Sequence, residues 1–206
     1  MYLINGKEVT KEEFQIPVED LVIWRGDGIF EAIGIHQGFL FALEEHIERF
    51  KKSAQKMHFD NIDFDKIEKD LVRVASNYDS GYMRVIIGRG ASKEESKVYM
   101  FYQDPIPVPD YYSLQSHKAH WMSGGDFQID EVSNIAAKST SYAMNMSHTR
   151  LAEKKRFTDS LLLNKDNIGS EISTIVENNL RTSGLFNPLS KEAFLQAPDI
   201  ANLKPR

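Results

Sequence analysis

Residues 28–57 read GIFEAIGIHQGFLFALEEHIERFKKSAQKM, and this stretch decides the fold. Its first half is apolar and is broken only at Gln37-Gly38, which predicts two strands around a turn. In its second half, apolar residues recur at spacings of four and three, which is one buried face of a helix. These helical positions are Leu43, Ile47, Phe50, Ala54 and Met57. A strand pair that leads into a helix predicts mixed α and β structure.

The sequence before and after this stretch continues the same pattern. Residues 2–4 are apolar and precede Asn5-Gly6, so we expect a hairpin at the N-terminus. A second helix should begin at Asp63, because an aspartate suits the N-cap position. Residues 82–88 and 97–102 are rich in β-branched, aromatic and other apolar residues, and they predict two further strands.

A proline-rich segment divides the chain. Residues 104–110 read DPIPVPD, and three closely spaced prolines favour an extended connection. We therefore expect a small α+β domain at residues 1–104, a linker at 105–110 and a larger domain at 111–206. The elements expected beyond the linker are a strand at 112–121, a helix at 141–155, a strand at 160–163 and a short helix at 191–197.

The composition of the 206 residues excludes several classes of protein. Lys and Arg number 25 against 30 Asp and Glu, and this acidic balance argues against a general nucleic-acid partner. The chain has no cysteine, which rules out disulfides, cysteine-ligated metals and thiol nucleophiles. Its six histidines form no metal-ligand pattern, and we expect no metal. No segment reads as a membrane span or a signal peptide, so we expect a cytoplasmic protein without a membrane partner.

Four motifs stand out when they are read together. They are RGDGIFE at 25–31, FALEEHIERF at 41–50, MRVIIGRG at 83–90 and AKSTSYAMNM at 137–146. In this order, and with Gly169-Ser170-Glu171 downstream, they resemble the class-IV aminotransferases, the fold type IV enzymes that use pyridoxal 5′-phosphate (PLP). The family includes branched-chain and D-amino-acid aminotransferases and 4-amino-4-deoxychorismate lyases. The resemblance implies a two-domain α+β fold of the D-amino-acid aminotransferase type, with an incomplete large domain, and a homodimer that acts on a small-molecule amine.

The resemblance also implies roles for three charged residues. Lys138 matches the lysine that forms a Schiff base with PLP, and its apolar and hydroxylic neighbours suit a partly buried amine of lowered pKa. Glu171 matches the glutamate that keeps the pyridine nitrogen of PLP protonated. Arg49 matches the arginine that holds the PLP phosphate. The alternative for Arg49 is a helix-surface arginine paired with Glu45.

Three further residues fall on family positions. Tyr142 stands where many members carry a tyrosine that contacts the cofactor or fixes the lysine, and its alternative is a core position on the helix. Arg84 aligns with an arginine near the substrate carboxylate, and its alternative is an exposed strand edge. Glu31 follows the Gly-Asp-Gly motif, and we expect it to be structural or to line the pocket.

The sequence departs from the family pattern after Glu171. Residues 172–176 replace a longer run whose backbone amides help to hold the cofactor, and Lys191 follows Ser190 where a phosphate-binding turn is expected. The missing part normally completes the larger domain. Three explanations are open: a naturally minimal or degenerate protein, a truncated reading frame, or omitted segments.

The resemblance implies a reaction in which the amino substrate forms an external aldimine and Lys138 moves a proton. One outcome is the aminodeoxychorismate lyase reaction, which eliminates pyruvate and gives 4-aminobenzoate. The other is transamination between a branched-chain or D-amino acid and a 2-oxo acid. Branched-chain enzymes usually carry Phe-Glu-Gly where this chain has residues 30–32 as Phe-Glu-Ala, which slightly favours the lyase. A shortened, non-catalytic scaffold is the third alternative.

Overall fold

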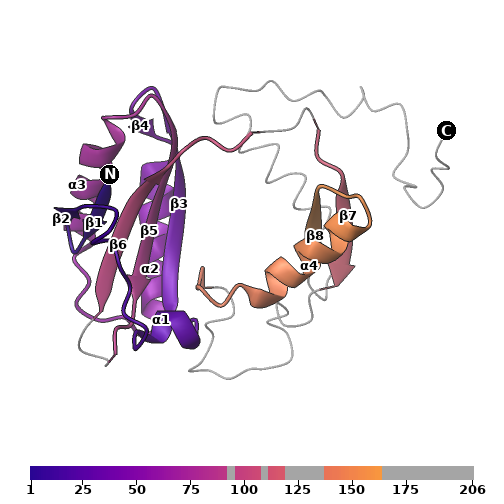
Figure 1. Cartoon of the computed structure of the whole chain (residues 1–206), viewed down its shortest axis with the longest axis horizontal. Helices are drawn as coiled ribbons and strands as arrows, with labels where there is room; N and C mark the ends of the chain where they lie inside the picture. Colours follow the sequence, from indigo (N-terminus) through magenta and orange to yellow (C-terminus); the bar gives the residue numbers. More distant parts are fainter. Residues whose placement is uncertain (92–95, 108–110, 119–136, 164–206) are drawn as a thin grey trace.

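The computed structural model describes residues 1–91, 96–107, 111–118 and 137–163 (Figure 1). The first part of the chain forms β1 (Tyr2–Ile4), β2 (Lys7–Val9), α1 (Leu21–Trp24), β3 (Gly28–His36), β4 (Phe39–Leu40), α2 (Leu43–Lys56), α3 (Phe64–Ala75), β5 (Ser80–Gly88) and β6 (Lys97–Gln103). The second part forms β7 (Leu114–Lys118), α4 (Ala143–Lys154) and β8 (Asp159–Leu163). The strands and helices predicted within these residues are confirmed, with ends that differ by a few residues. The predicted helix at 191–197 lies outside the described residues.

The strands form two separate sheets. The larger has six antiparallel strands in the order β2-β1-β6-β5-β3-β4, and the smaller pairs β7 with β8 in parallel. The smaller sheet and α4 lie beside the β3 side of the larger sheet (Figure 1). On the larger sheet, Ala32 of β3 lies opposite Arg84 of β5, and Arg84 lies opposite Phe101 of β6. This register decides which side chains share a face, because alternate residues of a strand point to opposite faces.

Helices α2 and α3 cover one face of the six-stranded sheet and form the hydrophobic core with it. The buried helical residues of this core are Ile47, Phe50, Ala54, Ile67, Leu71, Val74 and Ala75. They pack on the inward-facing residues of the strands, which include Ile29, Ile33, Met83, Val85 and Ile87. The side chain of Asp63 accepts a hydrogen bond from Lys66 N, so the predicted N-cap of α3 is confirmed.

Buried Asp20 fixes the loop that leads into β3. Its Oδ1 accepts hydrogen bonds from Val22 N and Gly90 N, each at 3.0 Å, and its Oδ2 accepts one from the hydroxyl of Tyr99 at 3.3 Å. Burial, together with the Asp20 carboxylate, raises the pKa of Tyr99 to about 12. These bonds tie the beginning of α1 to the ends of β5 and β6, and therefore fix where β3 begins.

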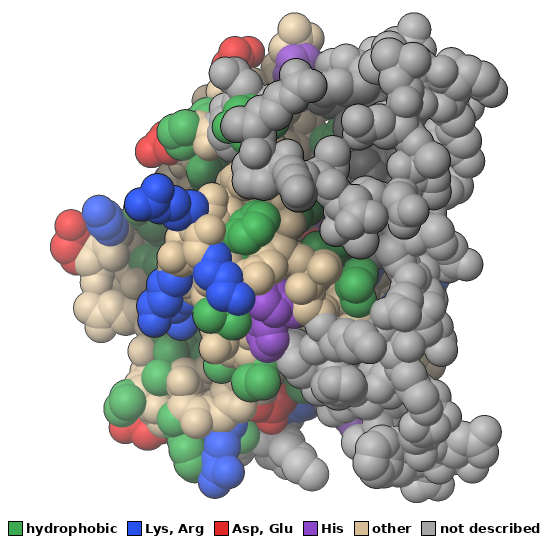
Figure 2. All heavy atoms as spheres, turned by 90° about the vertical axis from the view of Figure 1, so that its right-hand side faces the viewer, with side chains coloured by type: hydrophobic (Ala, Val, Ile, Leu, Met, Phe, Trp, Pro, Cys, Tyr) green, Lys and Arg blue, Asp and Glu red, His purple; other side chains and the backbone are tan. Residues whose placement is uncertain are grey.

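Helix α4 ends in a cluster of exposed basic side chains. They are Arg150, Lys154, Lys155 and Arg156. Lys and Arg side chains are prominent on the described part of the face that Figure 2 turns toward the reader. Lys154 lies in the last turn of α4, where positive charge interacts favourably with the helix dipole. None of the described helices is both long enough and apolar enough to cross a lipid bilayer.

Candidate active site

The backbone of Lys138 is attached to the edge of β3. Phe30 N donates to Lys138 O at 3.0 Å, and Thr140 N donates to Gly28 O at 2.8 Å. Ser139 lies between these residues and forms an antiparallel bridge with Ile29. Lys138 N donates to the hydroxyl of Ser53 on α2 at 3.1 Å. The segment that carries the lysine thus pairs with the beginning of β3 through an isolated bridge and also contacts the helical layer.

Two glycines of the RGDGIFE motif make this attachment possible. Gly26 has a φ of 64°, and a Cβ there would lie 2.6 Å from Ser141 Oγ. A Cβ on Gly28 would lie 2.5 Å from Val22 Cγ2 and 3.0 Å from Thr140 Oγ1. The hydroxyls of Thr140 and Ser141 donate to Gly26 O at 2.8 and 3.0 Å. These two motifs, more than a hundred residues apart, therefore fit together only when both positions are glycine.

The Lys138 side chain lies over the aromatic ring of Phe30. Its Nζ is 4.4 Å from the centre of that ring and 5.9 Å from the centre of the Tyr142 ring. The residue is half-buried. Burial lowers its pKa, and the charges of Arg49 and Arg84 lower it further, although Glu31 acts in the opposite direction. The predicted lowering of the lysine pKa is confirmed, and this favours the neutral, nucleophilic amine.

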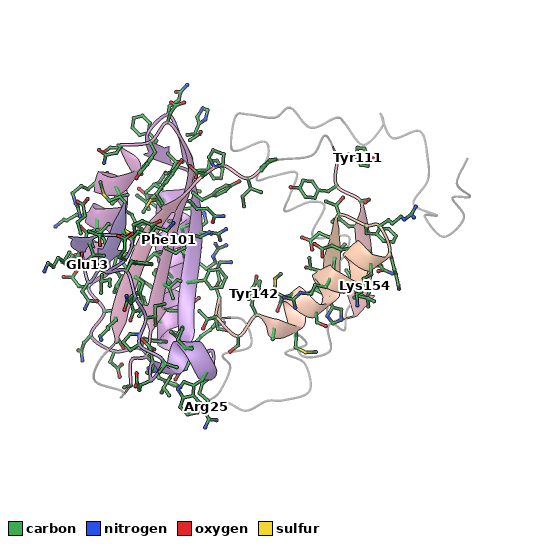
Figure 3. The ribbon with its side chains drawn as sticks, in the orientation of Figure 1. Glu13, Arg25, Phe101, Tyr111, Tyr142 and Lys154 are labelled. Atoms are coloured by element: carbon green, nitrogen blue, oxygen red, sulfur yellow. The ribbon has the colours of Figure 1, made fainter. Side chains whose placement is uncertain are left out.

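Tyr142 is not a core residue of α4. It lies at the N-cap of the helix, its side chain is 40% exposed, and its ring packs edge-on against Phe30 with centres 5.4 Å apart. Figure 3 shows it at the beginning of α4, between that helix and the larger sheet. The alternative of a buried helix tyrosine is therefore wrong, and Tyr142 borders the lysine instead.

Arg49 pairs with buried Glu31 and not with Glu45. Its Nε donates to Glu31 Oε1 at 2.6 Å and its Nη2 donates to Oε2 at 2.7 Å, a two-pronged contact. His46 Nδ1 lies 2.9 Å from the same carboxylate. Glu31 is 1% exposed and Arg49 is 53% exposed. The carboxylate thus holds one edge of the guanidinium, while much of the Arg49 side chain stays accessible.

The electrostatics of this cluster favour charged forms. Burial alone would raise the pKa of Glu31, but the hydrogen bonds from Arg49 and His46 outweigh it, and the net pKa is lowered. The hydrogen bond to Glu31 raises the pKa of Arg49. A permanent positive charge therefore lies within electrostatic reach of the half-buried Lys138 amine.

Arg84 lies on an inner strand, β5, so the edge-strand alternative is wrong. It is half-buried, and its Nε donates to Gln103 Oε1 on β6 at 2.7 Å. Its charge also acts on Lys138. The structure thus brings Lys138, Tyr142, Arg49 and Arg84 to one region. Glu171 lies outside the described residues.

A match to a family model shows which protein family the chain belongs to. The model of the amino-transferase class IV family matches residues 28–175. The chain belongs to the class-IV aminotransferase family. The match includes β3, α2, β5 and the lysine segment, which are the elements that form the candidate site.

Known class-IV aminotransferases and their relatives agree with this assignment. The chain is 35% identical over 99 residues to D-alanine aminotransferase of Bacillus licheniformis, covering 45% of this chain and 35% of that protein. It is 27% identical over 160 residues to a bifunctional aminodeoxychorismate lyase / D-amino acid transaminase of Mycobacterium tuberculosis, covering 72% and 55%. The chain therefore spans about a third to a half of these relatives.

Solved structures give the same fold. A hypothetical aminotransferase from Mycobacterium tuberculosis, in its PLP-bound form, superposes with a TM-score of 0.68 at 24% identity. The match covers 81% of this chain and 62% of that chain. The predicted fold class, α+β with the fold of the type IV PLP enzymes, is confirmed.

The C-terminal part of the chain has a second similarity. The model of the TolB amino-terminal domain matches residues 157–206. Over 80 residues the chain is 46% identical to the Tol-Pal system protein TolB of Pelagibacter ubique, covering 39% of this chain and 18% of that protein. The two family matches overlap at residues 157–175. The departures from the class-IV pattern after Glu171 therefore lie in a part of the chain that is similar to TolB, an explanation that the class-IV motifs did not suggest.

The sequence analysis missed three residues of the candidate site. Ser53, His46 and Gln103 bind Lys138, Glu31 and Arg84, respectively. Ser53 had one usable signal, because a serine between Phe50 and Ala54 is a polar residue on an apolar helix face. His46 and Gln103 had no signal of this kind, since their partners are distant in the sequence.

The Arg49–Glu31 pair leads to an asymmetric prediction about stability. Arg49→Ala leaves the buried Glu31 carboxylate without its main partner, and we expect the unfolding free energy to fall by about 2–3 kcal/mol at pH 7. Glu31→Gln leaves a half-exposed arginine that water can solvate, and we expect a loss of only about 1 kcal/mol. Urea unfolding of the two variants and the wild type measures both values.

The pH dependence of this effect has a defined sign. The pKa of Glu31 is lowered in the folded protein, so the pair stabilises the protein above the ordinary value of 4.5 and this contribution is lost as pH falls. The deficit of Arg49→Ala should therefore persist from pH 7 down to about pH 4.5 and shrink as the pH falls further. Arg73→Ala, which breaks an exposed pair with Asp70, is the matched control and should cost less than about 1 kcal/mol. Equal losses for the Arg49 and Glu31 variants would contradict the interpretation.

Proposed function

We propose that this chain binds PLP covalently on Lys138 and catalyses proton transfer on an amino-acid-type substrate. The observation that carries the proposal is the Lys138 amine: it is half-buried, its pKa is lowered, and it lies 4.4 Å from the Phe30 ring centre. A neutral lysine amine is the form that condenses with a carbonyl.

The residues around Lys138 fit this cofactor. Glu31 occupies Nε and Nη2 of Arg49, and among the described residues Nη1 of Arg49 has no hydrogen-bond partner and can donate to a phosphate. Tyr142 and Phe30 supply aromatic surface beside the lysine. For Glu171, outside the described residues, we propose the family role of holding the pyridine nitrogen in its protonated form.

The proposed chemistry follows from the properties of these side chains. Bound PLP would supply a ring that accepts electrons from the carbon next to the substrate amine. The Lys138 amine would then take the proton from that carbon as a general base and return it as a general acid. We assign to Arg84 the binding of the substrate carboxylate. Burial lowers the Lys138 pKa, and the charges of Arg49 and Arg84 lower it further, which favours the neutral amine.

Two reactions use this machinery, and we rank them. The first is elimination of pyruvate from aminodeoxychorismate to give 4-aminobenzoate, which the Phe-Glu-Ala sequence at residues 30–32 favours. The second is amine transfer from an amino acid to a 2-oxo acid, which the 35% identity to D-alanine aminotransferase favours. In either case we propose a homodimer, as the resemblance implies, and a cytoplasmic location.

The first test of this function is covalent attachment of the cofactor. The full chain is incubated with PLP, its visible absorbance is recorded, and the adduct is fixed with borohydride and mapped by peptide mass spectrometry. We expect a yellow protein with the reduced adduct on Lys138. Pyruvate release from aminodeoxychorismate and amine transfer to 2-oxoglutarate are then assayed in parallel to separate the two reactions.

The outcomes of this test are distinct. An adduct on Lys138 with either activity supports the enzyme. An adduct without activity means that the chain retains the cofactor site alone. If no lysine is labelled, the enzyme proposal fails, and the non-catalytic scaffold becomes the better description of a chain whose residues 157–206 are similar to TolB.

A further inference from the structure

The face of the larger sheet that is turned away from α2 and α3 carries a row of partly buried residues. On β3 this face is formed by Phe30, Ala32 and Gly34, and their opposite residues on β5 are Ile86, Arg84 and Tyr82. Lys138 lies over the Phe30 end of this row. Arg84 comes one alternation along the strands, about 7 Å further on.

The environment of Arg84 is asymmetric. On the β3 side it meets the small residue Ala32, followed by Gly34, where a Cβ would have no atom within 4 Å. On the β6 side Arg84 lies opposite Phe101, and the next residue on the same face, Gln103, accepts the hydrogen bond from Arg84 Nε on its Oε1 at 2.7 Å. The ring of Tyr82 lies 5.9 Å from the guanidinium carbon. Small residues therefore lie on the β3 side of Arg84, and a defined acceptor lies on the other.

Gln103 accepts a hydrogen bond from Nε of Arg84 and leaves the two terminal amino groups of the guanidinium available. Within the part of the chain that the structure describes, Arg84 has no ion-pair partner, and its two terminal amino groups donate to no side chain or carbonyl. An arginine bound through Nε presents these two amino groups side by side, which matches the two oxygens of a carboxylate. The guanidinium is oriented before any ligand arrives.

Residue 103 is a neutral glutamine, and this affects the charge that Arg84 presents to a ligand. A glutamate there would form an ion pair with Arg84 and compete with an incoming carboxylate. A glutamine accepts the same hydrogen bond but leaves the positive charge uncompensated. This contrasts with Arg49, which the buried carboxylate of Glu31 neutralises in part. The neutral partner keeps the attraction of Arg84 for an anion.

We propose that Gln103 is a positioning residue, which holds Arg84 so that its two terminal amino groups bind the carboxylate of the substrate. The inference rests on the proposed function, in which Arg84 faces that carboxylate. It adds that affinity for carboxylate ligands depends on a side chain that touches neither the cofactor nor the ligand. It also assigns to this subsite an anionic group, as opposed to a neutral amide or an ester.

Binding of an unreactive carboxylate tests this role without the cofactor. The full chain, free of PLP, is titrated calorimetrically with glutarate, and with glutaramide as the uncharged analogue. Wild type should bind glutarate and not glutaramide. Gln103→Leu removes the acceptor at similar volume, and Gln103→Glu keeps the acceptor but adds a negative charge. Each should weaken glutarate binding by about tenfold or more.

Two further variants complete the comparison. Arg84→Leu should abolish glutarate binding. Gln55→Glu makes the same change in charge at an exposed position of α2 and should bind glutarate as wild type does. In PLP-loaded protein, Gln103→Leu should raise the KM for D-alanine about tenfold and change kcat much less, because the contact orients a binding group and not the proton-transferring amine. A purely structural role would lower kcat as strongly as it raises KM.

The failures can be told apart. If wild type binds glutarate, Arg84→Leu does not and Gln103→Leu binds normally, the positioning role is overturned while the proposed function stands. If wild type binds no glutarate, there is no carboxylate subsite and the inference about Gln103 falls. The proposed function is judged separately by the adduct on Lys138. If glutarate binds but no adduct forms, the inference survives and the enzyme proposal does not.

Discussion

Replacing Lys138 with alanine should remove the yellow absorbance and the borohydride-stable adduct completely. Lys138 is the residue whose amine lies over the Phe30 ring with a lowered pKa, and alanine has no amine to form the covalent bond. Activity in either assay should fall by about 10²–10⁴-fold or more, because the proton-transferring group is also lost. The measurements are the visible spectrum and the reduced-peptide map.

The matched control for this variant is Lys154→Ala. Lys154 is exposed at the end of α4 and contributes nothing to the site (Figure 3). This variant should keep the absorbance, the adduct and the activity of the wild type. A full-strength adduct in Lys138→Ala would show that another lysine carries the cofactor. The backbone bonds of residue 138 do not use its side chain, so the variant should fold normally.

Arg89→Ala should be strongly destabilising, at about 3–5 kcal/mol. Arg89 is only 9% exposed and makes four hydrogen bonds. Two go to the Asp27 carboxylate, at 3.1 and 3.2 Å, and two to the carbonyls of Met57 and His58. Its guanidinium also lies 3.8 Å from the centre of the Phe59 ring. Removing it leaves a half-buried carboxylate and two carbonyls without their donor.

Two other variants sharpen this prediction. Arg89→Lys keeps the charge but cannot reach carboxylate and carbonyls together, so we expect it to lose more than half as much stability. Arg25→Ala is the control: Arg25 is exposed and stacks on exposed Trp24, and we expect a change below about 1 kcal/mol. Urea unfolding gives all three values. A loss for Arg89→Ala no larger than that for Arg25→Ala would mean that these contacts do not stabilise the fold.

The sequence predicted the elements that are determined by residues close together in the chain. The stripe from Leu43 to Met57 predicted α2, because each buried position follows the last by one helical turn. Asp63 predicted the beginning of α3 for a similar reason, since the capping bond joins residues only three apart. Strand pairing could be predicted at the Asn5-Gly6 turn, where the connection itself fixes the register.

The sequence could not predict partners that the sheet brings together. Arg49 seemed free to pair with Glu45, four residues away, but it pairs with Glu31 across the strand–helix junction. Gln103 reaches Arg84 only because β5 and β6 are neighbours in a known register. Only the resemblance predicted that Lys138 and Arg49 lie near each other. The structure supplies a physical link, because Lys138 N donates to Ser53 Oγ on α2, the helix that also carries Arg49.

The attachment of residues 138–140 to β3 has a consequence for association between chains. Strand β3 pairs with β5 along one edge. On its other edge, β4 pairs only with Ile35 and His36 at the C-terminal end of β3. Without the lysine segment, the free backbone groups of Gly28 and Phe30 would be an open sheet edge, to which a strand of another molecule could add. The residues that bring the reactive amine into place therefore also shield the sheet from edge-to-edge aggregation.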